Sequence, residues 1–161
     1  MGITALVVDN NPVLLRAISA LLQQEGCSVK TASNGLEALN ILKTFIPDIV
    51  FTDLIMPLVS GEQLCRIIRN TNELQGTYLV VVSAIIEDLE SLQAENFCDL
   101  LIAKGTIKEM RSSLVNALQR YTTHEPDESE TALLDTHISE HDEQSTVARE
   151  LVSERKHLQR V

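Results

Sequence analysis

Five short apolar runs, separated by segments of helical periodicity, constrain the fold of this 161-residue chain more than any other feature. The runs are ITALVVD (3–9), CSVKTA (27–32), DIVFTD (48–53), TYLVVVSA (77–84) and DLLIAK (99–104). They are rich in β-branched residues, and three of them lack the apolar and polar alternation of a half-solvated sheet. Such runs are typical of strands that are buried on both faces of a parallel sheet.

The segments between these runs repeat apolar residues at three- and four-residue steps, as an amphipathic helix does. In the first segment, Asn11 can cap a helix, Pro12 can occupy its first position and Gly26 can end it. Similar segments cover residues 34–45, 60–70, 87–96 and 106–121. The sequence therefore predicts a doubly wound α/β domain, with a five-stranded parallel sheet flanked by five helices and right-handed crossovers.

Polar residues end four of the five predicted strands, namely Asp9, Asp53, Ser83 and Lys104. Capping of the following helix explains an Asp or Ser at any one of these places. It does not explain Lys104, because the dipole at a helix N-terminus disfavours a cation. Ligands of doubly wound folds bind at the carboxyl ends of the strands, so we expect these four side chains to form one site.

Two carboxylates beside an Asn carbonyl provide too few oxygen ligands for a calcium cage. They suit Mg²⁺, which keeps several waters and binds one or two carboxylates together with phosphate oxygens. With the metal bound, an Asp carboxylate could attack phosphorus and form an aspartyl phosphate, while the Lys neutralises the phosphoryl oxygens. The strand ends therefore indicate phosphoryl chemistry.

The stretch DIVFTDLIMPLVSG (48–61) resembles the strand-three signature of the receiver domains of two-component response regulators. In that signature an Asp is followed by Met-Pro three and four residues later and by Gly at the eighth position. Asp53, Met56, Pro57 and Gly61 fill these places. The resemblance covers residues 3–121 and implies the flavodoxin-like, or CheY-like, fold.

The resemblance also implies a role for each residue at the strand ends. Asp53 is the phosphoacceptor, Ser83 the switch hydroxyl and Lys104 the phosphate-neutralising cation. The implied Mg²⁺ ligands are Asp9, Asn10, Asp53 and the backbone carbonyl of Ile55. The phosphoryl group would come from a histidine kinase or phosphotransfer protein. The chain is then a switch that assists its own phosphorylation and not an enzyme with turnover.

Three positions depart from the pattern of the family. Asn10 replaces a carboxylate next to the metal, Gly105 follows Lys104 where the family usually has Pro, and Leu101 replaces a common aromatic residue. Without proline we expect a trans peptide bond after Lys104. These changes keep a second interpretation open, in which the chain is a degenerate pseudo-receiver that dimerises or docks a partner without phosphorylation.

Composition limits the partners and the compartment. The formal net charge of −10 disfavours binding to nucleic-acid phosphates, and no apolar stretch is long enough to span a bilayer. The three cysteines have no paired spacing, which favours a reducing environment. We therefore expect a cytoplasmic protein that binds neither nucleic acid nor membrane.

After the receiver-like region (1–121), the acidic composition of residues 122–131 predicts a linker. Residues 132–161 are rich in helix formers and carry apolar residues at alternating a and d positions of two heptads. This helical tail is interpreted as the start of a coiled-coil signalling helix. It suggests a homodimer, through the receiver or the tail, and a downstream output domain or partner. His137 and His141 have the spacing of a metal site but are interpreted as solvated helix residues.

Overall fold

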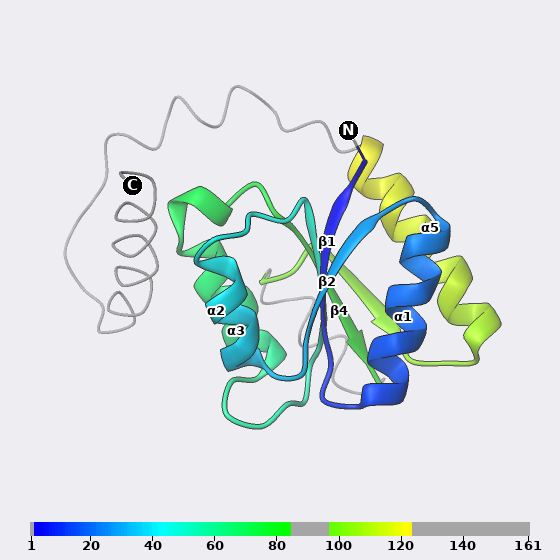
Figure 1. Cartoon of the computed structure of the whole chain (residues 1–161), viewed down its shortest axis with the longest axis horizontal. Coiled ribbons are helices and arrows are strands. Elements are labelled where there is room, and N and C mark those ends of the chain that lie inside the picture. The colour runs from blue at the N-terminus through cyan, green and yellow to red at the C-terminus, as the bar shows by residue number, and fades with distance from the viewer. Residues whose placement is uncertain (1, 85–96, 124–161) are drawn as a thin grey trace.

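The computed structural model describes residues 2–84 and 97–123, which form a five-stranded parallel sheet covered by helices on both faces (Figure 1). The strands are β1 (Thr4–Val8), β2 (Ser28–Ala32), β3 (Ile49–Asp53), β4 (Tyr78–Ser83) and β5 (Leu100–Ala103), in the order β2-β1-β3-β4-β5. The helices are α1 (Pro12–Gln24), α2 (Gly35–Leu42), α3 (Gly61–Arg69) and α5 (Ile107–Thr123), with a 3-10 helix η1 (Asn72–Leu74) before β4.

The predicted fold class is confirmed, and every predicted strand lies where the apolar runs placed it. Four of the five predicted helices are described, and α5 continues two residues past the predicted end, to Thr123. The predicted helix at 87–96 and the predicted tail at 132–161 lie outside the described residues, as does the linker after Thr123. No helix within 2–84 or 97–123 is long and apolar enough to cross a membrane.

Burial explains why the central strands show no alternation. Every residue of β3 and β4 is buried, whereas the edge strand β2 exposes Ser28, Lys30 and Thr31. Successive side chains of the central strands enter two separate hydrophobic layers. Leu6, Val50 and Leu79 pack on the side of α2 and α3, while Val7, Phe51 and Val80 pack on the side of α1 and α5 (Figure 1).

The first helix begins and ends as the sequence predicts. The Asn11 side chain accepts hydrogen bonds from the backbone N–H groups of Val13 and Leu14, at 3.0 and 3.4 Å, and Pro12 is the first helical residue. Gly26 has a φ of 86°, in the left-handed region that glycine adopts without strain. The turn from strand to helix at Asn11 therefore has a purely structural cause.

Glycine is also required where α3 begins, because the helix starts against the end of β3. The Gly61 N–H donates a hydrogen bond to the carbonyl of Leu54 at 2.9 Å. A Cβ on Gly61 would lie 2.1 Å from the backbone oxygen of Asp53. Ser60 and Gln63 form a capping box around this glycine, so the helix start is held directly beside the predicted phosphoacceptor.

The amino ends of β1 and β3 are joined through Asp48. Its Oδ2 accepts hydrogen bonds from both the N–H and the hydroxyl of Thr4, at 2.7 Å each. Burial by itself would raise the pKa of Asp48, but the hydrogen bonds from Thr4 and from the Tyr121 hydroxyl outweigh it and lower the pKa. This carboxylate therefore connects β1, β3 and the end of α5 at the edge opposite Asp53.

Candidate functional site

Two carboxylates and one ammonium group meet at the carboxyl edge of the sheet. The Nζ of Lys104 lies 2.9 Å from Oδ2 of Asp9 and 3.0 Å from Oδ2 of Asp53. The three side chains come from the ends of β1, β3 and β5, and are 1%, 10% and 14% exposed for Asp9, Asp53 and Lys104. Sequence reasoning predicted this convergence, because the carboxyl ends of parallel strands share an edge.

The charges in this cluster do not balance. Among the described residues one cation faces two buried anions, and each attraction is about 6 kcal/mol at an effective dielectric constant near 20, before desolvation is subtracted. Lys104 therefore neutralises only one unit of the two. The remaining negative charge at this edge of the sheet favours the binding of a second cation.

Each oxygen of the Asp9 carboxylate has a different contact. Its Oδ1 accepts a hydrogen bond from the N–H of Asn11 at 2.7 Å, and its own N–H donates to the carbonyl of Ala32 at 3.2 Å. Its Oδ2 is buried and accepts no hydrogen bond within the described residues, so its contact there is the ion pair with Lys104. A buried carboxylate oxygen whose contact is a cation fits a site that binds positive charge.

The other predicted metal ligands flank this pair. Asn10 follows Asp9 and is exposed, and Ile55 lies in the loop after Asp53 with 59% of its surface exposed. Residues 2–84 and 97–123 contain no group of three or more His, Cys, Asp or Glu side chains placed to hold a metal. A divalent cation here would thus rely on two carboxylates with amide, backbone and water oxygens, a donor set that suits Mg²⁺.

Ser83 lies at the end of β4, and 1% of its surface is exposed. Asp53 pairs with Val82 in the register of β3 and β4, so Ser83 is one residue beyond the position opposite Asp53. The carbonyl of Ser83 accepts a hydrogen bond from the N–H of Lys104 at 2.7 Å. Ser83 therefore holds the backbone of the residue whose side chain bridges the two carboxylates.

The loop from β5 to α5 has the trans backbone that the glycine after Lys104 predicts, since the described residues contain no cis peptide bond. Leu101, at the place of the family's aromatic residue, is half-buried and packs against the layer formed with α2 and α3. The sequence prediction missed a capping box at the start of α5. Thr106 and Glu109 form it, and the pattern Thr-x-x-Glu was the available signal.

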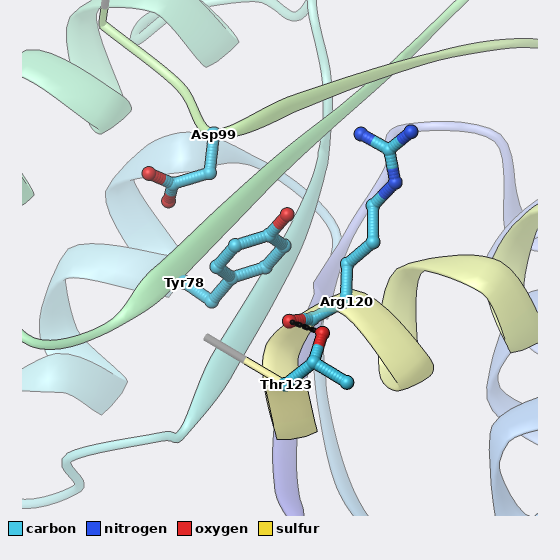
Figure 2. A pocket seen from close by; sticks show the side chains of 4 residues that line it. All are labelled: Tyr78, Asp99, Arg120 and Thr123. Carbon is cyan, nitrogen blue, oxygen red and sulfur yellow. Dashed lines mark hydrogen bonds between the residues drawn. The ribbon is translucent and has the colours of Figure 1, made fainter. Parts of the chain in front are cut away.

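A hollow of about 350 Å³ lies at the opposite edge of the sheet (Figure 2). It is lined by Tyr78, Asp99, Arg120 and Thr123. Asp99 is already engaged, since its Oδ2 accepts a hydrogen bond from the N–H of Leu79 at 2.6 Å and pairs with Arg69. None of the predicted site residues lines this hollow, so the carboxyl edge remains the candidate site.

The sheet order and the cluster of Asp9, Asp53 and Lys104 define a receiver domain of two-component signalling. The family model described as "Response regulator receiver domain" matches residues 5–97, and the chain belongs to this family. The match includes the strand-three signature from Asp53 to Gly61.

Similar proteins agree with this membership. Protein PilG of Pseudomonas aeruginosa is 32% identical over 83 residues, which cover 52% of this chain and 62% of PilG. Response regulator MprA of Mycolicibacterium vanbaalenii is 30% identical over 135 residues, which cover 83% of this chain and 58% of MprA. The matched region thus spans less than two thirds of each relative.

Solved structures show the same fold. The receiver domain of a sensor histidine kinase from Pseudomonas aeruginosa PAO1, with a magnesium ion coordinated in its active-site cleft, is 26% identical with a TM-score of 0.66. That match covers 76% of this chain and 99% of the other. TrrA of Thermotoga maritima, in complex with Mg²⁺ and BeF, is 26% identical with a TM-score of 0.62 and covers 73% of this chain and 99% of that chain.

Proposed function

We propose that this receiver domain is a phosphorylation-dependent signalling switch in which Asp53 accepts a phosphoryl group from a histidine kinase or phosphotransfer protein. The observation that carries the proposal is the Lys104 ammonium, which lies within 3.0 Å of both Asp9 and Asp53. Burial of two carboxylates beside one lysine costs desolvation free energy, and such a cost is not required for the stability of the fold. Buried like charges gathered at the carboxyl edge of a parallel sheet favour a functional site.

In the proposed reaction an oxygen of the Asp53 carboxylate attacks the phosphorus of a phosphohistidine. The new P–O bond forms as the P–N bond breaks, and the leaving imidazole keeps the electron pair and is protonated. Lys104 is already placed at Oδ2 of Asp53, so its ammonium can donate hydrogen bonds to the phosphoryl oxygens. The product carries about −1.5 to −2 charges at the sheet edge, which biases the nearby loops toward a second arrangement.

The residues that would hold Mg²⁺ are Asp9, Asp53, the side-chain oxygen of Asn10 and the backbone carbonyl of Ile55. When bound there, the metal would neutralise negative charge on the phosphoryl oxygens. The negative charge that Lys104 leaves unbalanced on Asp9 and Asp53 supports this assignment, as do the magnesium-containing receivers to which the chain is similar. Because Asn10 carries no charge, we expect weaker binding than a second carboxylate would give.

This function implies a cytoplasmic protein that acts through partners and has no turnover of its own. The partner that donates the phosphoryl group is a histidine kinase or phosphotransfer protein. A downstream output domain or partner would read the phosphorylated state. Dimerisation, through the receiver or through residues 132–161, is a further element of the proposal.

One observation favours the alternative, a pseudo-receiver that docks a partner without phosphorylation. Lys104 contacts Asp9 as well as Asp53, so a single side chain partly neutralises the site with no metal present. Asn10 adds no charge to attract one. A domain of this kind would keep the fold and the surface while the site remained unmodified.

Intact mass spectrometry of the full chain, after incubation with acetyl phosphate with and without Mg²⁺, separates these functions. The switch predicts a gain of one phosphoryl mass that depends on Mg²⁺ and maps to Asp53. Asp53→Asn should abolish the gain, and Asp9→Asn should slow it. A wild-type mass that never changes would reject the switch and favour the pseudo-receiver.

A further inference from the structure

The loop that carries Lys104 lacks the residue that usually stiffens it. Gly105 stands where the family commonly has proline, and glycine allows many more backbone conformations. Yet the Lys104 side chain must lie between Asp9 and Asp53, at 2.9 and 3.0 Å. The hydrogen bond from the Lys104 N–H to Ser83 fixes the loop on the strand side only. Something must fix it on the helix side.

Glu109 supplies that second attachment. Its Oε2 accepts hydrogen bonds from both the N–H and the hydroxyl of Thr106, at 2.8 Å each, and its own N–H donates to that hydroxyl at 3.3 Å. The next residue, Met110, is buried at 1% exposure and donates the first helical hydrogen bond, to the carbonyl of Thr106. The loop is thereby tied, two residues after Lys104, to a helix that is anchored in the core.

Gly105 makes room for this carboxylate. A Cβ on Gly105 would lie 2.6 Å from Oε2 of Glu109, closer than real Cβ contacts. Any other residue at this position, proline included, would push the carboxylate away. Gly105 and Glu109 are therefore matched to each other, and together they restrain the loop in a different way from proline.

We propose that Glu109 is a positioning residue, which restrains Gly105 and Thr106 so that the Lys104 ammonium stays between Asp9 and Asp53. The inference rests on the proposed function, because it assigns Glu109 an effect on the phosphorylation of Asp53. The competing explanation is an ordinary helix cap that stabilises α5 and nothing more. The chain contains a control for that explanation at the start of α2.

The control is Glu37, whose Oε2 accepts hydrogen bonds from the N–H and hydroxyl of Ser33 at 2.8 and 2.6 Å. Glu37 and Glu109 are both exposed, and their hydrogen bonds to Ser33 and Thr106 lower the pKa of each. Glu37→Ala thus removes hydrogen bonds to the N–H and hydroxyl of Ser33, the residue before the N-cap Asn34, from a helix that does not follow Lys104. A role in stability alone predicts equal behaviour of the two alanine variants.

The experiment measures the rate at which the full chain acquires phosphoryl label from acetyl phosphate with Mg²⁺. Glu109→Ala should slow labelling by about threefold or more, because displacement of a charged group by a fraction of an ångström is costly to such reactions. Glu109→Gln should label at the wild-type rate, since its amide oxygen can still accept from Thr106. Glu37→Ala should also label at the wild-type rate. Equal slowing by Glu37→Ala and Glu109→Ala would overturn the proposal.

Two further substitutions, each alone and combined with Glu109→Ala, test the route through Lys104. Gly105→Ala, whose Cβ displaces the carboxylate, should slow labelling as Glu109→Ala does, and the two changes combined should slow it no further. In a Lys104→Gln background, Glu109→Ala should have no additional effect on the rate. If it slows labelling equally in that background, Glu109 does not act through Lys104 and the inference is wrong.

Hydrogen exchange separates failure of this inference from failure of the proposed function. If the wild-type chain acquires no phosphoryl label, the phosphorylation switch is rejected. The restraint of the loop by Glu109 is then tested by the hydrogen-exchange rate of the Lys104 backbone amide. Faster exchange in Glu109→Ala than in wild type, Glu109→Gln and Glu37→Ala would support the restraint. Equal exchange in all four proteins would overturn it.

Discussion

Gly61→Ala is the substitution with the most direct structural consequence at the candidate site. The added Cβ would lie 2.1 Å from the backbone oxygen of Asp53, 2.9 Å from its carbonyl carbon and 3.0 Å from the Cα of Leu54. Ordinary contacts begin at 3.4 Å, so the closest pair must separate by more than 1 Å. All three atoms belong to the backbone and cannot rotate away. Either the start of α3 or the end of β3 must move.

The expected loss of stability follows from this rigidity. Overpacking of a well-packed interior costs about 1 to 3 kcal/mol, and a clash with backbone alone belongs at the upper end. The better helix propensity of Ala returns up to about 1 kcal/mol, which leaves a net loss of about 2 kcal/mol. For a domain of this size that corresponds to a decrease in Tm of roughly 6 to 9 °C.

Gly76→Ala is the matched control, because a Cβ there meets no atom within 4 Å and Gly76 has no positive φ. It should change the free energy of unfolding by less than about 1 kcal/mol, and in the stabilising direction. Urea unfolding followed by far-UV circular dichroism measures both variants, since the chain contains no Trp. If the two variants differ by less than about 0.5 kcal/mol, a value typical of ordinary surface substitutions, the close approach of α3 to Asp53 is refuted.

Three other substitutions or conditions test separate parts of the structure. Asn10→Asp should tighten Mg²⁺ binding at least tenfold in a calorimetric titration. Unit charges 4 Å apart attract each other by roughly 4 kcal/mol, and even a third of that free energy corresponds to a tenfold change in affinity. An unchanged affinity would place the metal elsewhere. Thr4→Val should lower the free energy of unfolding by about 1.5 kcal/mol at pH 7, because it removes the hydroxyl that donates to the Asp48 carboxylate and accepts from the Asp48 N–H. The pKa of Asp48 is lowered by folding, so its contribution is complete above pH 3.8 and the deficit of the variant should shrink as the pH falls below that value. Burial and the charge of Asp99 raise the pKa of the Cys98 thiol to about 11. Alkylation of Cys98 by iodoacetamide should therefore be slow at pH 8 and should accelerate up to pH 10. Fast alkylation of Cys98 at pH 8 would contradict this environment.

Much of the fold could be predicted because burial on both faces leaves a strong mark on the sequence. The strands β1, β3 and β4 appear as unbroken apolar runs, and the caps Asn11 and Gly26 identify the limits of α1 directly. Asp9, Asp53 and Lys104 could be grouped for a related reason, since parallel strands bring their carboxyl ends to one edge.

Other features depend on distances that no local pattern contains. The sequence did not indicate that Lys104 would contact Asp9 as closely as Asp53, because the two carboxylates lie on different strands. Asp48 and Thr4 are 44 residues apart, so their hydrogen bonds follow from the strand register alone. The pattern Thr-x-x-Glu could have predicted the capping box of Thr106 and Glu109. The proposed link to Lys104 could not be predicted, because it depends on how close Gly105 lies to the Glu109 carboxylate.

The division of the core into two layers has a consequence for how such a domain can diverge. Side chains on the α2 and α3 side belong to one cluster, those on the α1 and α5 side to another, and the backbone of the sheet separates them. Substitutions in different layers share no partners, so their effects on stability should add. One face can therefore be remodelled over evolutionary time, for example to suit a new partner, without compensating replacements on the other. Such remodelling need not alter the strand ends that carry Asp9, Asp53 and Lys104.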